Sequence, residues 1–305
     1  MKRRTLLRHA LGSVPMALAG CALPPLTALR PSGLVFAPAG SGMPLTGSGM
    51  PFVGSGFVRK AMAQREFQQY FLVSGASFRF GPKPAYGKPW TSQHEAGYAN
   101  NKRDSRIGYA VKNLSTGAYL AEHQADRLMN GCSMPKPAVS AVLLESRAGR
   151  LSREEFQHVV NACDLSVNAS WMAMLARFTY ADEQAFEAKY RLPDVPLRAN
   201  AQSPRYYAEF FERCVNYKLD YGCELLLEAM RRNQYGIGHW YLPGEISYLG
   251  GKTGNAAHYQ HEALFFYYRG SAYAIVLYTQ DRFAMDGNFW KIGALFGGLF
   301  REHIA

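Results

Sequence analysis

Apolar residues recur along this chain with two periods, one typical of helices and one of strands. The segment FVRKAMAQREFQQYFL, from Phe57, has the helical spacing. The segment RIGYAVKNLSTGAYLAEHQ, from Arg106, alternates, turns at Ser115-Thr116-Gly117 and alternates again. This pattern predicts a helix and then a β-hairpin. Residues 81–104, which include GPKPAYGKPW, show neither period and predict a loop.

The remainder of the chain is helical in its middle and strand-forming towards its end. Helical spacing covers five stretches: 133–147, 152–160, 168–178, 203–215 and 224–232. ISYLGGKTG, HEALFFYYRG and SAYAIVLYTQ then predict three strands, and FWKIGALFGGLFREHI predicts a closing amphipathic helix. A sheet made from both ends of the chain, with helices between, satisfies this order. We therefore predict an α+β fold, an antiparallel sheet flanked by helices with an all-helical subdomain inserted over about residues 131–235.

The first twenty residues have the pattern of an export signal. MKRRTLLRH is basic, and ALGSVPMALAG is apolar but too short to span a bilayer as a mature helix. LAGC, at Leu18–Cys21, resembles the lipobox of bacterial lipoproteins, in which the cysteine is lipidated. RRTLLR also resembles a twin-arginine signal, with Lys2 in place of Ser or Thr. We expect residues 1–20 to be removed and a lipid on Cys21 to hold the protein at the periplasmic side of a bacterial membrane. Ordinary cleavage near Ala19 is the alternative.

Residues 21–56 have the composition of a linker. They are rich in Gly, Ser and Pro and repeat the motif GSGMPLT, GSGMPFV, GSGFV. Such segments are flexible or semi-extended. We predict a tether here and a globular domain over residues 57–305.

The charge of the chain suits an anionic surface. The formal net charge is +11, of which the basic residues of the export segment supply four, leaving +7. A membrane or a cell-wall polymer is a fitting partner for such a charge. There is no stripe of interleaved basic and aromatic residues, so nucleic acid is not an expected partner.

Export implies an oxidising compartment, in which the four cysteines after Cys21 can form disulfides. Cys214 and Cys223 are near neighbours on either side of a predicted bend, which favours their pairing. Cys132 and Cys163 would then form the second pair. Buried free thiols are the alternative.

The stretch NGCSMPKPAVSAVLLES, from Asn130, contains the first candidate for chemistry. Lys136 follows Ser133 by three residues and lies between two prolines. Proline is tolerated in the first turn of a helix, so the helix is predicted to begin at about Ser133. A hydroxyl at a positive helix end, beside an amine that can take its proton, describes an activated nucleophile. Taken alone, the pair is equally consistent with a helix cap and a solvated lysine.

Two further short motifs follow in order. SVN, Ser166–Asn168, falls at a predicted turn between helices, and Lys252, Thr253 and Gly254 end a predicted strand. Ser-x-x-Lys, Ser-x-Asn and Lys-Thr-Gly in this order resemble the signature set of the serine β-lactamases and penicillin-binding proteins. The hairpin before the first motif and the two strands and helix after the third are also similar to that fold. The resemblance covers residues 57–305 and looks closest to class A β-lactamases.

The resemblance implies a role for each residue of the three motifs. Ser133 attacks an acyl carbon, Lys136 accepts its proton and Ser166 relays a proton to the leaving nitrogen. Lys136 must be partly neutral for this, and nearby positive charge such as that of Lys252 would favour the neutral form. Asn168 is expected to hold Lys136 and the substrate amide.

The third motif is implied to bind the substrate. Lys252 and Thr253 suit a carboxylate, and Gly254 lets the substrate backbone lie along the strand edge. The backbone N–H groups of Ser133 and of Asn255 or Ala256 would form the oxyanion hole. The resemblance implies neither a metal nor a cofactor.

The chain departs from class A β-lactamases at the deacylation base. That family has Glu-x-x-Leu-Asn in its omega loop, whereas here the nearest match is DVPLR, Asp194–Arg198. Asp194 is the candidate base, with Arg198 in place of the asparagine. Glu183 and Glu187 lie upstream in a helical pattern.

Three functions remain open. The first is β-lactam hydrolysis through an acyl-Ser133 intermediate. The second is a D-alanyl-D-alanine peptidase acting on peptidoglycan stem peptides, and the third is a non-catalytic lipoprotein that binds wall fragments. A monomer is expected in each case.

Overall fold

The computed structural model describes residues 87–231, 233, 236–284 and 289–305. The export signal, Cys21, the tether and the helix expected from Phe57 lie outside these residues. Among the described residues, no helix is both long enough and apolar enough to cross a membrane.

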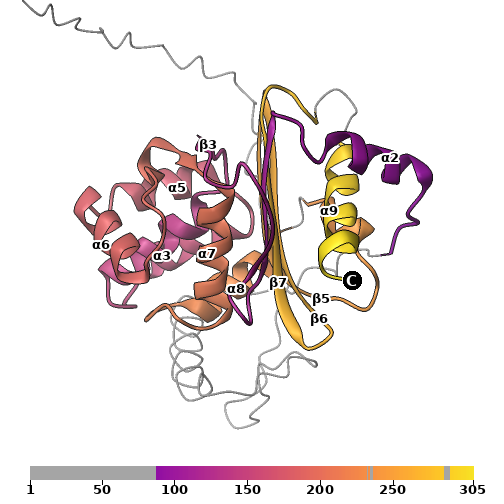
Figure 1. Cartoon of the computed structure of the whole chain (residues 1–305). Helices are drawn as coiled ribbons and strands as arrows, with labels where there is room; N and C mark the ends of the chain where they lie inside the picture. The colour runs from indigo at the N-terminus through magenta and orange to yellow at the C-terminus, as the bar shows by residue number, and fades with distance from the viewer. Residues whose placement is uncertain (1–86, 232, 234–235, 285–288) are drawn as a thin grey trace, which may run out of the picture. The chain divides into compact units, whose positions relative to one another are not determined.

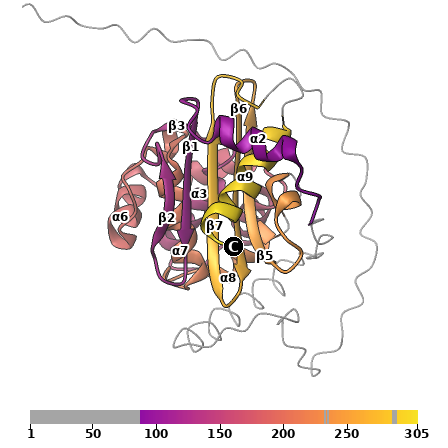
Figure 2. The same ribbon diagram turned by 45° about the vertical axis from the view of Figure 1, so that its right-hand side comes forward.

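A five-stranded antiparallel sheet joins the two ends of the described chain. Its strand order is β2-β1-β7-β6-β5, so the early hairpin pairs with the last strand of the sequence (Figure 2). The strands are β1 (Ile107–Asn113), β2 (Tyr119–His123), β5 (Ser247–Ala256), β6 (Tyr259–Tyr268) and β7 (Ser271–Thr279). The predicted hairpin, the three later strands and their assembly into one sheet are confirmed. A separate two-stranded sheet, β3 (Met129–Asn130) with β4 (Ala201–Gln202), was not predicted.

Helices cover both faces of the five-stranded sheet (Figure 1). On one face lie α2 (Ser92–Asn101) and α9 (Trp290–His303), with the 3₁₀ helix η2 (Gly238–Tyr241) against α9. The helices on the other face are α3 (Lys136–Ser146), α4 (Arg153–Cys163), α5 (Asn168–Leu175), α6 (Tyr180–Tyr190), α7 (Pro204–Val215) and α8 (Cys223–Arg231). The short 3₁₀ helix η1 (Leu197–Ala199) lies between α6 and β4. The α+β fold class is confirmed.

Alternate residues of the central strands enter two separate hydrophobic cores. On β6, Ala263 and Phe265 join the core beneath α3 to α8, whereas Leu264 and Phe266 join the core beneath α2 and α9. Because both faces of the sheet are covered, these strands are continuously apolar rather than alternating.

The loop predicted over residues 81–104 is wrong in part, because α2 forms within it. Thr91 caps this helix, with His94 completing the capping box. The buried residues of α2 are Gly97 and Tyr98, so its sequence carries almost no apolar period. A Cβ on Gly97 would lie 2.4 Å from the Trp290 ring, which shows how closely α2 packs on α9.

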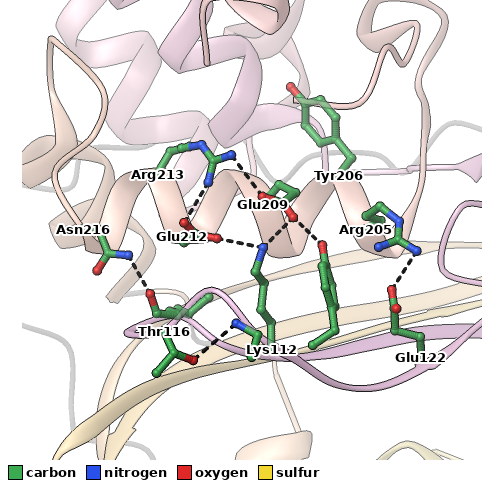
Figure 3. Close-up of polar contacts among 12 residues, drawn as sticks. Lys112, Thr116, Glu122, Arg205, Tyr206, Glu209, Glu212, Arg213 and Asn216 are labelled. Atoms are coloured by element: carbon green, nitrogen blue, oxygen red, sulfur yellow. Dashed lines mark hydrogen bonds and ion pairs between the residues drawn. The ribbon is translucent and has the colours of Figure 1, made fainter. Parts of the chain in front are cut away.

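The hairpin is fastened to α7 by buried charges (Figure 3). Lys112 on β1 is 2% exposed, and its ammonium group lies 2.5 Å from Glu209 and 2.7 Å from Glu212. The Tyr119 hydroxyl on β2 donates to Glu209 at 2.6 Å. These contacts hold α7 against β1 and β2, at one edge of the sheet. They thereby also help to position β4 (Ala201–Gln202), which directly precedes α7.

The predicted disulfides are wrong, because Cys132, Cys163, Cys214 and Cys223 are all free thiols. The Cys223 thiol is directed at the carbonyl of Leu219, 3.7 Å away, in the turn that precedes α8. Cys214 is buried in the core on α7. Cys214 and Cys223 are therefore close in sequence, on either side of the bend between the two helices, but their sulfur atoms are not bonded.

Candidate functional site

The turn that carries Ser133 lies between β3 and α3. Asn130 ends β3, and its side-chain oxygen accepts the Cys132 N–H at 2.9 Å. Cys132 has a left-handed backbone (φ 52°), and the Met134 N–H donates to the Gly131 carbonyl at 2.8 Å. The helix therefore begins at Lys136, and its predicted start at Ser133 is three residues too early. The Cys132 and Met134 N–H groups are already hydrogen-bonded within the turn, and the helical hydrogen bonds begin after it.

The two prolines do lie at the start of the helix, as predicted. Pro135 is the N-cap residue and Pro137 lies in the first turn. Neither ring removes an N–H that the helix would use.

Lys136 brings the first two motifs together. The side chain is fully buried, and its Nζ lies 2.8 Å from the Ser133 Oγ. The same Nζ lies 2.8 Å from the Asn168 Oδ1 and 3.1 Å from the Ser166 Oγ, and it also donates to the Ser166 carbonyl. The expected proximity of Ser133 and Lys136 is therefore present, and the lysine is not a solvated surface residue.

SVN forms the turn that presents Ser166 to this cluster. Ser166 has a left-handed backbone (φ 60°), and Asn168 is the first residue of α5. A left-handed conformation is unusual for serine and costs conformational energy, which the packed surroundings must offset. The turn places the Ser166 hydroxyl and the Asn168 amide oxygen on the same ammonium group.

The third motif approaches from β5. Lys252 is fully buried, and its Nζ donates to the Ser166 Oγ and to the Thr253 carbonyl, each at 2.9 Å. The Ser166 hydroxyl therefore lies between two lysines. Thr253 is 4% exposed, and Asn255 is exposed near the end of the strand.

Gly254 has a structural requirement that the sequence did not reveal. A Cβ at this position would lie 2.7 Å from the Gly131 carbonyl oxygen and 3.1 Å from the Met134 nitrogen. Both atoms belong to the backbone of the turn that carries Ser133. Glycine therefore lets β5 lie directly against this turn.

Burial changes the proton affinity of both lysines. It lowers the pKa of Lys136 to about 8. Burial, together with the charge of Lys136, lowers the pKa of Lys252 to about 7. The lowered pKa expected for Lys136 is present, but its main cause is burial rather than the charge of Lys252. Either lysine can thus exchange a proton near neutral pH.

The structure does not bring Asp194 into this cluster through any described hydrogen bond. Asp194 is exposed in the loop between α6 and β4. Arg198, which stands in place of the family's asparagine, donates to the carbonyls of Leu175, at 2.7 Å, and Phe178. Arg198 thereby ties the loop to the segment between α5 and α6. The role of Asp194 stays a prediction.

Two buried glutamates of α6 hold the same loop from beneath. The Glu183 carboxylate accepts the Leu197 N–H at 2.8 Å, and Arg198 lies 3.7 Å from its second oxygen. Burial raises the pKa of Glu187 to about 8, with the charge of Glu183 adding to the effect. Their spacing of four residues on a helix was the available signal that they act on one neighbour.

The comparisons with known proteins rest on structure alone. No model of a known protein family matches the chain, and no curated protein matches it in sequence. It is similar to L2 in a crystal structure with relebactam, with a TM-score of 0.53 and 14% identity over 69% of this chain and 100% of that chain. It is also similar to an ancestral class A β-lactamase, GNCA, with a TM-score of 0.54 and 17% identity over 69% of this chain and 98% of that chain.

A third structure agrees. A variant of the last common ancestor of Gram-negative class A β-lactamases, bound to 5(6)-nitrobenzotriazole, has a TM-score of 0.55 and 14% identity over 69% of this chain and 96% of that chain. At these identities the likeness establishes the fold. The chain therefore has the β-lactamase/transpeptidase fold that its three motifs predicted.

Proposed function

We propose that this protein is a serine acyl-enzyme hydrolase of the class A β-lactamase type, which opens β-lactam rings through an acyl-Ser133 intermediate. One observation carries the proposal: hydrogen bonds run without a break from Ser133 through Lys136 and Ser166 to Lys252. Such a chain supplies a nucleophile, a base and a proton relay within one buried cluster.

Acylation uses this chain in one direction. The Ser133 Oγ forms a bond to the lactam carbonyl carbon while its proton passes to Lys136. The lactam C–N bond then breaks, and Lys136 returns the proton to the ring nitrogen through the Ser166 hydroxyl. Asn168 keeps the Lys136 amine directed at Ser133 while this happens. The backbone N–H groups of Ser133 and of Asn255 or Ala256 would stabilise the developing oxyanion.

In this proposal, residues of β5 bind the substrate. The ammonium of Lys252 and the hydroxyl of Thr253 would hold the β-lactam carboxylate. Lys252 then has two roles, because it also contacts the Ser166 hydroxyl.

Hydrolysis of the acyl-enzyme needs a base that activates water. We assign this role to Asp194. Because Asp194 is exposed and outside the cluster, it would activate water less well than a carboxylate fixed beside Ser133. This observation favours a second candidate, a D-alanyl-D-alanine peptidase acting on peptidoglycan stem peptides, which needs no dedicated deacylation base.

We further propose export, a lipid on Cys21 and action as a monomer at the periplasmic side of the membrane. The LAGC stretch supports the export and the lipid anchor. Cys21→Ser should release the protein from the membrane fraction, and a wild-type protein that is already released would contradict the anchor.

A chromogenic cephalosporin separates the candidate functions. Steady colour development supports the β-lactamase. Colour limited to one equivalent, with a stable adduct, supports the peptidase. Neither colour nor adduct would contradict both and leave a non-catalytic wall-binding protein.

A further inference from the structure

His261 on β6 is a buried histidine that none of the three motifs contains. It is fully buried and pairs across the sheet with Gly254, which packs on the turn that carries Ser133. Its Nε2 lies 2.7 Å from the Asn130 carbonyl oxygen, and its Nδ1 lies 3.0 Å from the Thr279 nitrogen.

These two bonds fix the tautomer of the ring. A backbone N–H can only donate, so Nδ1 accepts from Thr279 and carries no proton. Nε2 therefore bears the proton of the neutral ring and donates it to the Asn130 carbonyl. Burial supports the neutral form, since it lowers the pKa of His261 to about 4.

A second side chain works beside the first. The His261 ring stacks on Tyr278 of β7, with centroids 4.3 Å apart, and the Tyr278 hydroxyl donates to Gln202 at 3.0 Å. Asn130 belongs to β3 and Gln202 to β4. The stacked pair thus connects β3 and β4 of the small sheet to β6 and β7 of the large sheet.

The small sheet leads directly into the site. β3 ends at Asn130, three residues before Ser133, and the Gly131 N–H donates to the carbonyl of Asn200, just before β4, at 2.7 Å. On the other side, the Gly131 carbonyl lies against Gly254 of β5. The distance between Ser133 and the Lys-Thr-Gly strand therefore depends on how far β3 stands from β6.

We propose that His261 is a positioning residue for acylation, which sets that distance through its hydrogen bond to the Asn130 carbonyl. The proposal rests on the proposed function of Ser133 as nucleophile. Ser133 follows β3, and Asn255 or Ala256 lies on β5, which pairs with β6, the strand that carries His261. The backbone N–H groups of these residues would supply the two halves of the oxyanion hole. A shift of about an ångström between them would cost on the order of a hundredfold in rate.

A pair of substitutions isolates this one bond. In His261→Gln the amide N–H can take the place of Nε2 and donate to the Asn130 carbonyl. In His261→Asn the side chain is one methylene shorter, so its amide oxygen can take the place of Nδ1 and reach Thr279 but not Asn130. Thr279→Val is the matched control: it removes the hydroxyl that bonds Gln260 at the same end of the sheet, without touching β3.

The readout is the acylation rate constant of Ser133 at saturating penicillin, followed by intact mass and separated from the apparent binding constant. We expect His261→Asn to lower the rate constant by about ten- to a hundredfold with little change in the binding constant. His261→Gln should recover most of the loss, and Thr279→Val should stay within about threefold of wild type at a similar loss of thermal stability. Equal rate constants for His261→Asn and Thr279→Val would overturn the proposal.

A second readout separates this proposal from the proposed function. If the wild type itself is not acylated, the proposed function fails, and amide hydrogen exchange then decides on His261. The Cys132 and Met134 amides should exchange faster in His261→Asn than in Thr279→Val and His261→Gln. Equal exchange in the three variants would show that His261 does not hold the turn.

Discussion

Two lysine side chains, Lys136 and Lys252, are fully buried on either side of the Ser166 hydroxyl. Burying two ammonium groups so close together is unfavourable unless hydrogen bonds offset the lost hydration. The oxygen acceptors around Lys136 supply such bonds, and the lowered pKa values show that part of the cost remains. The cost is understandable if the lysines must move protons near neutral pH.

The pH dependence of acylation should report this pair of lysines. Lys136 must lose its proton to accept that of Ser133, so the rate rises as pH increases towards about 8. Lys252 must keep its proton to bind a carboxylate, so the rate falls as pH passes about 7. Since the two groups interact, the observed values belong to the pair. We expect a bell-shaped profile of acylation efficiency centred between about pH 7 and 8.

Two observations check this profile. Lys252→Arg keeps its charge at all accessible pH values, so the alkaline fall should disappear while the acid limb remains. A wild-type rate that climbs steadily to pH 10 would show that Lys136 has the proton affinity of an exposed lysine.

At this scale the sequence predicted which side chains meet. The order and spacing of the three motifs identified Ser133, Lys136, Ser166, Asn168 and Lys252, and the structure gathers all five. The sequence did not predict that burial is the main cause of the lowered lysine pKa values, because burial depends on segments far away in sequence. The sequence did not identify His261 either, because a lone histidine in a strand belongs to no motif and its contacts come from distant segments.

Among the elements, the closeness of β5 to the turn that carries Ser133 is the feature that builds the site. It depends on Gly254, because a side chain there would meet backbone atoms that cannot rotate away. The motif identified this glycine, but only the structure shows what surrounds it.

Gly254→Ala should therefore impair the site without unfolding the protein. The new Cβ would force β5 and the turn apart, and we expect acylation to slow by about ten- to a hundredfold. Gly244→Ala is the control, since a Cβ at that glycine meets nothing within 4 Å. Acylation rates followed by intact mass provide the measurement, and equal rates for the two variants would contradict this account of the strand.

In the proposed reaction, the loop between α6 and β4 supplies the base for the second half, deacylation. Glu183 and Arg198 fasten it, and Asp194 is its exposed carboxylate. The match to Glu-x-x-Leu-Asn was too weak for the sequence to place a base, because the loop differs from the family pattern at two of its three defining positions.

Deacylation should be slower than acylation, giving a burst followed by slow turnover. Asp194→Asn should slow the second phase and leave the burst amplitude unchanged, because the proposed acylation steps do not use Asp194. Stopped-flow measurements with a chromogenic cephalosporin resolve both phases. Fast steady turnover without a burst, unchanged in Asp194→Asn, would show that another group activates the water.

Across the whole described molecule, helices on both faces of one sheet position the site, and most of them were predictable from apolar periods. The helix α2 was not, because its sequence carries almost no such period. The hairpin and the last three strands each have a clear pattern, and their assembly follows from the need to bury both faces. The two-stranded sheet was not predictable, since each strand has two residues and pairs across about seventy positions. The prediction of disulfide bonds was wrong because closeness in sequence does not determine the direction in which a cysteine side chain points.

The buried ion pairs between the hairpin and α7 should contribute to global stability. Lys112→Met leaves Glu209 and Glu212 without their most buried cation, although Arg213 and Lys218 remain near them. We expect a loss of about 1–3 kcal/mol in the free energy of unfolding. Arg205→Gln, on the same helix, breaks more exposed pairs and should cost less than about 1 kcal/mol. Denaturant unfolding measures both, and equal losses would show that the Lys112 pairs are no more important than surface ones.

The most direct test of the whole account is the intact mass of the protein after exposure to a penicillin. We predict one covalent adduct of the mass of the antibiotic, located on the peptide that contains Ser133 and absent in Ser133→Ala. An adduct that persists in Ser133→Ala, or a wild-type protein that forms none under any condition of pH between 6 and 9, would contradict the assignment of Ser133 as the nucleophile.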